Sequence, residues 1–353
     1  MTLLFIIGRL HPNLTQWVAA FEQEGWSVSV LVGRESVNRV ESVKPRIISP
    51  DQIDAKMAAS LIDEIQPDLV VIRSKDEGHR RVVKAAKARG AKAIYYDQRS
   101  YLRPSGFRAL YRELRKAIRR ARQGHPRVGI TTTRGVGDVP KLWRHWIRVP
   151  MPVPESVNSR DYFREGVPSI LLVGRLANDK KRHLWVLQAL EEFGGPYRLV
   201  VAGAGDDSHT APEKRSRDYY DEVRRTLSAP SVSDRVTLME DVLHEEMPAL
   251  YRQADIFVLP SRQELLGISI IEAMSQGCAV IASSGAGATG YMTDETDGLV
   301  FPRDKYEEFR DRLHVLLRNP GRAQELGKAA ADTIRNRHRH ADFVSHIRQI
   351  AKL

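Results

Sequence analysis

The sequence contains very little cysteine: Cys278 is the only one in 353 residues. A lone thiol excludes an internal disulfide and a zinc site built from several cysteines, and it favours a reducing compartment. No apolar run approaches the roughly 20 residues that a membrane-spanning helix needs. The opening segment Met1–Ile7 lacks the basic start of a signal peptide. We therefore expect a soluble, cytoplasmic protein, either free or held peripherally on the inner face of the cytoplasmic membrane.

Acidic residues are outnumbered by basic ones: 55 Lys and Arg stand against 44 Asp and Glu, which gives a net charge of +11. Such an excess attracts nucleic acid, anionic lipid or phosphorylated small molecules, without choosing among them. No recognised nucleic-acid-binding module accompanies the charge, so we expect no nucleic-acid partner. The length exceeds what one hydrophobic core usually holds and predicts two domains.

Short apolar runs alternate with amphipathic stretches along the chain, which is typical of parallel sheets with helices on both faces. We expect strands at Leu3–Ile7, Ser27–Val32, Leu69–Ile72, Lys92–Tyr96, Ser169–Val173, Tyr197–Ala202, Arg235–Leu238, Ile256–Leu259 and Ala279–Ala282. Helices are expected between them, for example at Leu14–Glu24, His79–Arg89, Leu184–Phe193, Ser216–Leu227, Glu245–Arg252 and Ile270–Gln276. The pattern predicts an α/β protein with two Rossmann-like parallel-sheet domains.

A proline-rich segment near mid-chain, Val149–Pro154, reads as an interdomain linker. We therefore divide the chain into a domain at 1–148, a linker at 149–156 and a domain at 157–334. The stretch Ala323–Leu353 is expected to be helical, and the C-terminal helix at 335–353 is expected to cross back to the first domain. Two such sheets would face each other across a cleft, with ligands at the carboxyl ends of their strands. His338 and His340 are expected at the surface of the last helix.

The most informative segment follows the strand at Ile256–Leu259. Glu264 lies in a loop and Glu272, eight positions later, lies on a short helix. Gly267, between them, allows backbone amides to approach a ligand closely, and a carboxylate suits the paired hydroxyls of a ribose. An alternative needs no ligand: Ser269 and Glu272 have the Ser-x-x-Glu spacing of a helix capping box.

Residues Pro260–Gly277 resemble the Glu-x7-Glu region of the retaining glycosyltransferases of family 4 (glycosyl transferases group 1), which have the GT-B fold. Further family-like motifs occur in the same order over roughly residues 168–302: Val173–Lys180, Leu199–Gly205, Met247–Ser261, Gly277–Ser283 and Gly298–Pro302. The chain departs from the family at Asp179, where Glu is usual, and at Lys181, where Gly is usual. Met239–Asp241 also lacks a usual glycine.

The resemblance implies a retaining transferase that moves a hexose from a UDP- or GDP-linked sugar to a glycan or lipid-linked acceptor, in bacterial surface polysaccharide or lipopolysaccharide biosynthesis. It implies no cofactor and no required metal. The first domain would bind the acceptor and the second the donor. Residues implied for the donor are Arg175 and Lys180 (pyrophosphate), the amides of Gly267, Ile268 and Ser269 (phosphate or sugar oxygens), Glu272 (ribose) and Glu264 (donor sugar, catalytic). The alternative for the cations is a solvated basic turn at Lys180–His183.

The first half matches the family less well. In the first strand-to-helix loop only Gly8 corresponds to the glycine pair of relatives, and we assign it to donor binding. Asp97, after the fourth strand, is the nearest match to a His or His-Asp pair that relatives carry near the reacting sugar. We assign it a catalytic role by that resemblance; the alternative is a residue that caps the end of a strand.

Basic residues concentrate in Phe107–Arg127, which contains eight of them against the single acid Glu113. Phe107, Leu110, Tyr111, Leu114 and Ile118 would form one apolar stripe on a helix. Three uses remain open: contact with an anionic membrane surface, packing on the chain's own sheet, or binding of a phosphorylated acceptor. Two alternative functions also remain: a catalytically degenerate binding or scaffold protein, and a transferase that acts on a soluble sugar phosphate.

Overall fold

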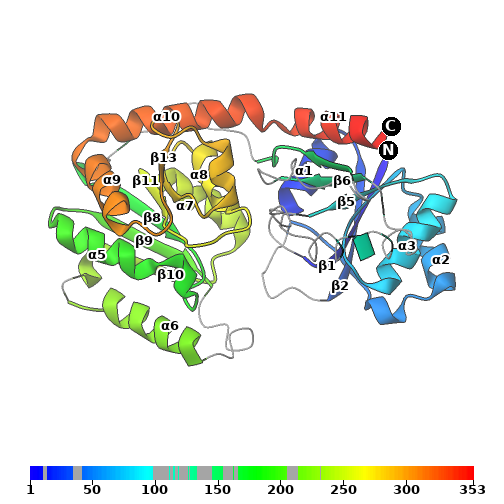
Figure 1. Cartoon of the computed structure of the whole chain (residues 1–353), viewed down its shortest axis with the longest axis horizontal. Helices are drawn as coiled ribbons and strands as arrows, with labels where there is room; N and C mark the ends of the chain where they lie inside the picture. Colours follow the sequence, from blue (N-terminus) through cyan, green and yellow to red (C-terminus); the bar gives the residue numbers. More distant parts are fainter. Residues whose placement is uncertain are drawn as a thin grey trace. The chain divides into compact units, whose positions relative to one another are not determined.

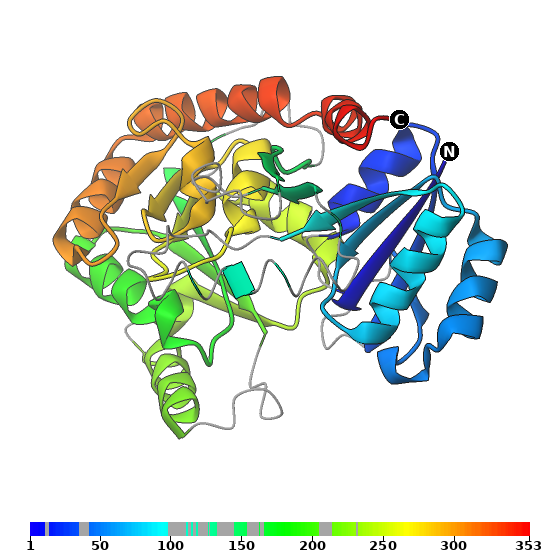
Figure 2. The same cartoon turned by 45° about the vertical axis from the view of Figure 1, so that its right-hand side comes forward.

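The computed structural model describes residues 1–10, 14–34, 42–97, 111, 114–115, 118, 126, 128–132, 145–153, 162, 166–204, 214–230 and 232–353 (Figures 1 and 2). The chain divides into two compact units, Met1–Pro152 with His338–Leu353, and Val153–Arg337. Each unit contains a parallel sheet flanked by helices. The predicted α/β class with two Rossmann-like domains is therefore confirmed, while the cleft between them stays a prediction.

The described part of the first unit has a seven-stranded parallel sheet in the order β3-β2-β1-β4-β5-β6-β7. Its strands are β1 (Thr2–Arg9), β2 (Ser27–Arg34), β3 (Arg46–Ile47), β4 (Leu69–Arg73), β5 (Lys92–Tyr96), β6 (Val128–Thr131) and β7 (His145–Arg148). Its helices are α1 (Thr15–Gln23), η2 (Pro50–Gln52), α2 (Ala55–Ile65), α3 (Glu77–Ala88) and α11 (His340–Ala351). The central strands are apolar on both faces because α2 and α3 pack together on one side and α1 and α11 on the other.

The C-terminal stretch consists of two helices. α10 (Pro320–Arg337) belongs to the second unit and α11 to the first. His338 lies at the break; it is buried rather than at the surface, and its Nδ1 is 2.7 Å from the carbonyl oxygen of Met151. Met151, in the predicted linker, is itself buried, and its sulfur accepts a hydrogen bond from the Trp17 indole (3.3 Å). The described end of the linker is therefore packed structure.

The described part of the second unit has a six-stranded parallel sheet in the order β10-β9-β8-β11-β12-β13. Its strands are β8 (Ser169–Val173), β9 (Arg198–Gly203), β10 (Val236–Glu240), β11 (Ile256–Leu259), β12 (Ala279–Ser283) and β13 (Leu299–Phe301). Its helices are η5 (Asp179–Lys181), α5 (His183–Phe193), α6 (Lys214–Leu227), η6 (Ser233–Arg235), η7 (His244–Glu246), α7 (Met247–Gln253), α8 (Ile268–Ser275), η8 (Gly287–Tyr291), α9 (Tyr306–Arg318) and α10.

The strand order of the second sheet reverses between β8 and β11. α5 packs against α6 and α9, whereas α8 packs against α7 and α10, so two helical layers enclose the sheet (Figure 1). The loops after β8 and β11 leave their strands at the same edge and diverge to opposite layers. In open α/β sheets this switch point is where ligands bind. The fold thus brings η5 and the β11–α8 loop together at one edge.

Backbones approach closely at this edge. A Cβ atom on Gly203, at the end of β9, would lie 1.8 Å from the carbonyl oxygen of Gly174, just after β8. No side chain fits there without moving the backbone, which accounts for the glycine at position 203. Asp241, after β10, has a φ of 55°, in the left-handed region that Asp tolerates better than most residues. It ends the segment Met239–Asp241, in which the family resemblance leads us to expect a glycine.

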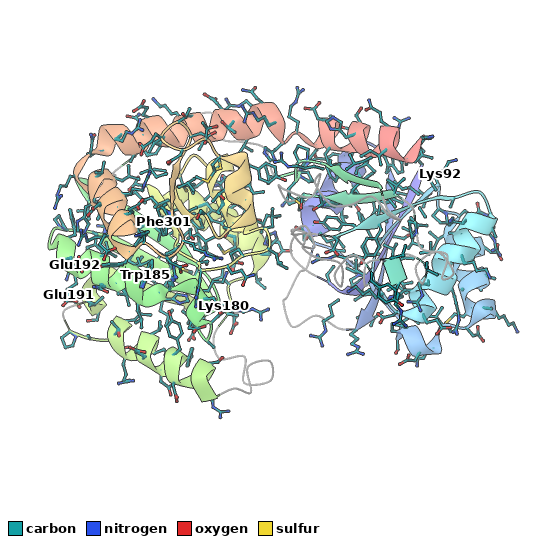
Figure 3. All side chains as sticks on the ribbon, in the orientation of Figure 1. Lys92, Lys180, Trp185, Glu191, Glu192 and Phe301 are labelled. Atoms are coloured by element: carbon teal, nitrogen blue, oxygen red, sulfur yellow. The ribbon has the colours of Figure 1, made fainter. Side chains whose placement is uncertain are left out.

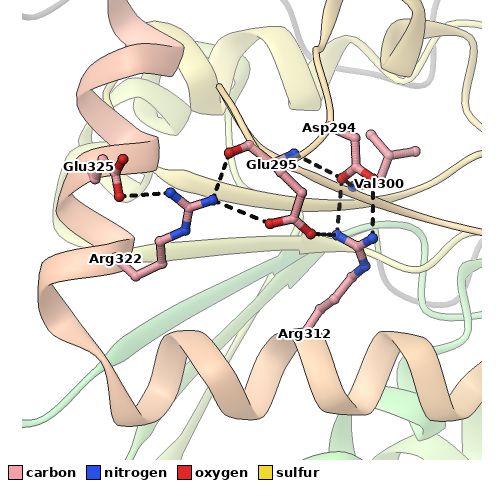
Figure 4. A network of polar contacts seen from close by, with 6 residues as sticks. All are labelled: Asp294, Glu295, Val300, Arg312, Arg322 and Glu325. Carbon is pink, nitrogen blue, oxygen red and sulfur yellow. Dashed lines mark hydrogen bonds and ion pairs between the residues drawn. The ribbon is translucent and has the colours of Figure 1, made fainter.

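A network of arginines and carboxylates fixes the turn that precedes β13 (Figure 4). Arg312 of α9 contacts Asp294 (3.0 Å) and Glu295 (2.8 Å), and Asp294 also accepts a hydrogen bond from the amide of Val300 (2.8 Å). Arg322 of α10 bonds the carbonyl oxygen of Glu295 (2.6 Å). The network joins the turn to two helices and holds Glu295 at a φ of 64°.

Gly78, on α3, provides a test of the packing in the first unit. Replacing a helical glycine by alanine usually stabilises a protein by up to about 1 kcal/mol. A Cβ atom at Gly78, however, would lie 1.9 Å from the carbonyl oxygen of Pro50 in η2. We expect Gly78→Ala to lower the free energy of unfolding by about 1–3 kcal/mol, measured by chemical denaturation. Gly321→Ala on α10 is the matched control and should be neutral or stabilising; equal effects of the two changes would contradict the packing.

Candidate functional site

The β11–α8 loop ends at Gly267, which has a φ of 75° and precedes the first residue of α8. A Cβ atom there would also lie 3.3 Å from a side-chain methyl of Leu259. No side chain caps α8 within the described residues, and the first bonded amide is that of Ile270, to the carbonyl oxygen of Gly267 (3.0 Å). The amides of Ile268 and Ser269 therefore remain at the positive end of the helix, where an anion is favoured.

Glu272 lies one turn further along α8 and is only 7% exposed. Its Oε2 accepts a hydrogen bond from the hydroxyl of Tyr251 on α7 (2.9 Å). Its Oε1 has no hydrogen-bond partner among the described residues, and the nearest cationic candidate, Nε2 of His244, is 3.9 Å away. Burial raises the pKa of Glu272, and His244 and the Tyr251 hydroxyl oppose that rise. The carboxylate thus has one oxygen held and one available.

This geometry shows that the capping-box alternative is wrong. The helix begins at Ile268 after Gly267, so Ser269 lies inside the first turn instead of preceding it. The Glu272 carboxylate is bonded to Tyr251 and not to a backbone amide. Neither of the two hydrogen bonds of a capping box is present. Capping of α8 therefore does not explain why Glu272 is buried.

The loop after β8 carries the predicted cations. Arg175 and Lys180 are both exposed, and the amide of Arg262 donates a 2.7 Å hydrogen bond to the carbonyl oxygen of Lys180. This bond joins the loop to the β11–α8 loop, so the structure brings Lys180 to the same edge as Glu264 and α8. Figure 3 shows Lys180 and Trp185 in this region. Between η5 and α6 lies a cavity of about 510 Å³, lined by Asp179, Lys180, Arg182, Leu184, Trp185, Ser216, Tyr219 and Arg262.

The interpretation of Lys180–His183 as a solvated basic turn is wrong for three of its four residues. Lys181 forms an ion pair with Glu264, and both side chains are less than one-fifth exposed. Arg182 pairs with Asp304 (2.6 Å) and stacks on the ring of Trp185, 3.9 Å from its centroid. His183 is buried. Lys180 alone of the four is exposed.

The two predicted residues of the first unit lie at the carboxyl ends of strands. Gly8 is near the end of β1, and a Cβ atom there would meet nothing within 4 Å. Asp97 follows β5, is 4% exposed, and its amide donates to the carbonyl oxygen of Ile130 (3.1 Å). Both sit where a ligand of this sheet would bind; their roles stay predictions.

The segment Phe107–Arg127 lies mostly outside the described residues. Tyr111, Leu114, Arg115 and Ile118 are described and helical. The three apolar side chains are 57%, 45% and 47% exposed, respectively. The stripe that they form is thus open to solvent at these positions, which disfavours the alternative that it packs on the chain's own sheet.

The sequence analysis did not identify Tyr251 or His244 as neighbours of Glu272, and it did not predict the ion pair between Lys181 and Glu264. Tyr251 lies within the family-like segment Met247–Ser261, so its motif was visible although its contact with Glu272 was not. Lys181 was visible as a departure from the family pattern. His244 carried no signal, because the 28-residue separation between it and Glu272 is bridged only by the fold.

Comparison with known proteins finds a family pattern in this part of the chain. Residues 167–319 match the family model of glycosyl transferases group 1. The matched segment, which we call the group 1 domain, contains Arg175, Lys180, Glu264 and the whole of α8.

Curated relatives match about half of the chain. A D-inositol 3-phosphate glycosyltransferase from Xylanimonas cellulosilytica is 29% identical over 185 residues, which is 51% of this chain and 42% of the relative. A GDP-mannose:cellobiosyl-diphosphopolyprenol alpha-mannosyltransferase from Xanthomonas oryzae is 29% identical over 170 residues, 46% of this chain and 42% of the relative. The chain thus spans about two fifths of the length of these relatives.

Solved structures share the fold over the full chain. Anabaena HepE in complex with UDP and glucose has a TM-score of 0.72 and 13% identity, with all of both chains covered.

Within the described residues, no three His, Cys, Asp or Glu side chains gather in a way that could hold a metal ion. Of the helices described, none is long and apolar enough to cross a membrane.

His183 gives a test of the electrostatics beneath η5. Burial, followed by the nearby charge of Lys181, lowers the pKa of His183 to about 4 from 6.5. A histidine with a depressed folded-state pKa stabilises the fold above the unfolded pKa, and that stability is lost as pH falls from about 6.5 to about 4. We expect His183→Asn to remove about 3 kcal/mol of this pH dependence of the unfolding free energy. Chemical denaturation between pH 7 and pH 4 measures it, with the exposed His346→Asn as control. If the unfolding free energies of wild type and His183→Asn change with pH in the same way, the lowered pKa of His183 is wrong.

Proposed function

We propose that the protein is a glycosyltransferase that uses a nucleoside diphosphate sugar as donor. One observation carries the proposal: a buried carboxylate, Glu272, keeps one oxygen without a hydrogen-bond partner among the described residues, next to the uncapped N-terminus of α8. Leaving a buried carboxylate oxygen unmatched is costly, and ionisable groups perturbed in this way concentrate at functional sites. A ribose diol would satisfy that oxygen.

The remaining contacts of the donor follow from the same edge of the sheet. The diphosphate would meet the amides of Ile268 and Ser269, where the helix dipole favours negative charge. Arg175 and Lys180 are exposed cations after β8, and their charge would stabilise the diphosphate as it leaves. The match of residues 167–319 to the family model of glycosyl transferases group 1 supports this arrangement.

The reaction breaks the bond between the anomeric carbon and the diphosphate oxygen and forms a bond from that carbon to an acceptor hydroxyl. Negative charge grows on the leaving phosphate, and preorganised amides and cations lower the barrier by stabilising it there. In the family-based proposal, the acceptor attacks from the face that the diphosphate leaves, its proton passes to a phosphate oxygen, and the configuration of a hexose is retained. No protein nucleophile or metal is then needed. Glu264 would contact the donor sugar, and Asp97 stays a candidate catalytic group.

The donor site is tested by calorimetric titration with UDP and GDP. We expect one of them to bind, and Glu272→Gln to weaken that binding by about 10- to 100-fold, because hydrogen bonds to a charged group are lost. The exposed Glu308→Gln on α9 is the matched control. Because the ribose needs an ionised acceptor, wild-type affinity should also fall as pH drops through the raised pKa of Glu272, above its ordinary value of 4.5.

Failure of both nucleotides to bind a folded wild type would favour the alternative of a degenerate binding or scaffold protein. A different outcome would contradict the role of Glu272. If nucleotide binding is the same in Glu272→Gln and does not change with pH near the raised pKa of Glu272, this carboxylate does not contact the donor.

We further propose that the acceptor is a glycan carried on an anionic lipid, as part of surface polysaccharide or lipopolysaccharide assembly, with the protein peripheral on the membrane that holds it. The exposed Tyr111, Leu114 and Ile118 support this, since they interrupt a strongly basic segment, and basic helices with an apolar stripe bind anionic interfaces. The name of the Xanthomonas relative, with its diphosphopolyprenol, agrees. The name of the Xylanimonas relative favours the second candidate, a soluble sugar phosphate as acceptor.

Vesicle sedimentation distinguishes the two acceptors. We expect the protein to bind vesicles that contain phosphatidylglycerol, and to bind them less at high salt. Replacing Leu114 and Ile118 together by serine should weaken binding by at least about tenfold, because their apolar side chains enter the interface. Val315→Ser, at a side chain 52% exposed on α9, is the control. A wild type that binds no vesicles would favour the soluble acceptor, and equal binding by all three proteins would show that Leu114 and Ile118 do not enter the interface.

A further inference from the structure

The ion pair between Lys181 and Glu264 links two loops of the proposed donor site. Lys181 ends η5 and Glu264 lies midway along the β11–α8 loop. The ammonium of Lys181 contacts Oε1 of Glu264, and the two side chains are 17% and 19% exposed. Within the described part of the chain, Oε2 of Glu264 makes no hydrogen bond. The pair is therefore shielded from bulk water while one carboxylate oxygen remains available.

Both partners are held in place by their surroundings. The stem of Lys181 lies across Gly174, where a Cβ atom would approach its Cδ to 2.9 Å. The amide of Glu264 donates to the carbonyl oxygen of Gly285 (3.0 Å), which ties that loop to the end of β12. Three loops at the edge of the sheet thus fix the pair before any ligand arrives.

The pair also lies next to the start of α8. A Cβ atom on Gly267 would be 3.6 Å from the Cβ of Glu264. A free carboxylate there would oppose the attraction of the helix N-terminus for an anion, because like charges repel and a partly buried site screens them less than bulk water does. Lys181 removes that repulsion because its charge cancels the charge of Glu264.

We propose that Lys181 is a positioning residue of the donor site. It holds the Glu264 carboxylate against η5, directs Oε2 toward the donor, and neutralises Glu264 so that a diphosphate can occupy the N-terminus of α8. The proposal rests on the proposed function. It gives a role to Lys181, where the resembling family has glycine and therefore no side chain to balance the first glutamate of the pair.

The experiment is a double-mutant cycle in calorimetric titrations with whichever of UDP and GDP binds the wild type. Lys181→Met keeps the length of the stem over Gly174 and removes the charge. We expect it to weaken nucleotide binding by about tenfold, because the Glu264 charge is then uncompensated. Adding Glu264→Gln removes the other charge and should restore affinity to within about threefold of wild type. Lys181→Arg should retain binding, and Lys328→Met, exposed on α10, is the control.

Each other outcome overturns the proposal in a recognisable way. If Lys181→Met binds the nucleotide as tightly as the wild type does, the ion pair between Lys181 and Glu264 only stabilises the fold. The substitution would then lower the melting temperature without changing nucleotide affinity. If affinity falls and Glu264→Gln does not restore it, Lys181 contacts the phosphates directly and does not act through Glu264. If the wild type binds neither nucleotide, the proposed function itself fails, and this inference falls with it.

Discussion

A carboxylate kept inside the protein is the constraint on which the second unit depends. Glu272 is buried and, among the described residues, accepts a single side-chain hydrogen bond, from Tyr251. Burying a charge without full pairing costs several kcal/mol. The surroundings are arranged to hold that one bond: the thiol of Cys278 lies 3.0 Å from the carbonyl oxygen of Tyr251, and the hydroxyl of Ser275 donates to the carbonyl oxygen of Glu272 (2.7 Å). These contacts join α7, α8 and the residue before β12 around the Glu272 carboxylate, whose burial lowers the stability of the fold.

The sequence was a good guide where burial is uniform. β5, β8 and β11 match the predicted strands residue for residue, because strands covered on both faces are continuous apolar runs bounded by polar residues. β3 was missed since it has only two residues, both exposed. The sequence did not show that His338, at the break between α10 and α11, is buried, because its contact is with Met151, 187 residues away. Information of that range is absent from any local window.

The candidate site divides in the same way. Motif spacing placed Glu264, Glu272 and Lys180 on the correct loop, helix and turn, because these positions are set by the strand that precedes them. It could not show that Tyr251 would bond Glu272 or that Lys181 would pair with Glu264, since both contacts need two segments that only the sheet order brings together. Asp241 shows the converse case: the left-handed backbone of its loop persists although the expected glycine is absent.

The assignment of α11 to the first unit has a consequence for the order in which the protein can be completed during synthesis. Phe343 of α11 packs edge-on against Trp17 and near Phe21, at ring-centroid distances of 4.6 and 6.1 Å. The ribosome delivers Trp17 and Phe21 first and Phe343 last, with the entire second unit between them. The synthesis of the first unit therefore starts before that of the second unit and ends after it. Until α11 has been made, the aromatic side chains of α1 lack their contact with Phe343. A nascent chain exposes apolar surface for as long as such a partner is missing, so the aromatic side chains of α1 are covered only after the last helix has been made.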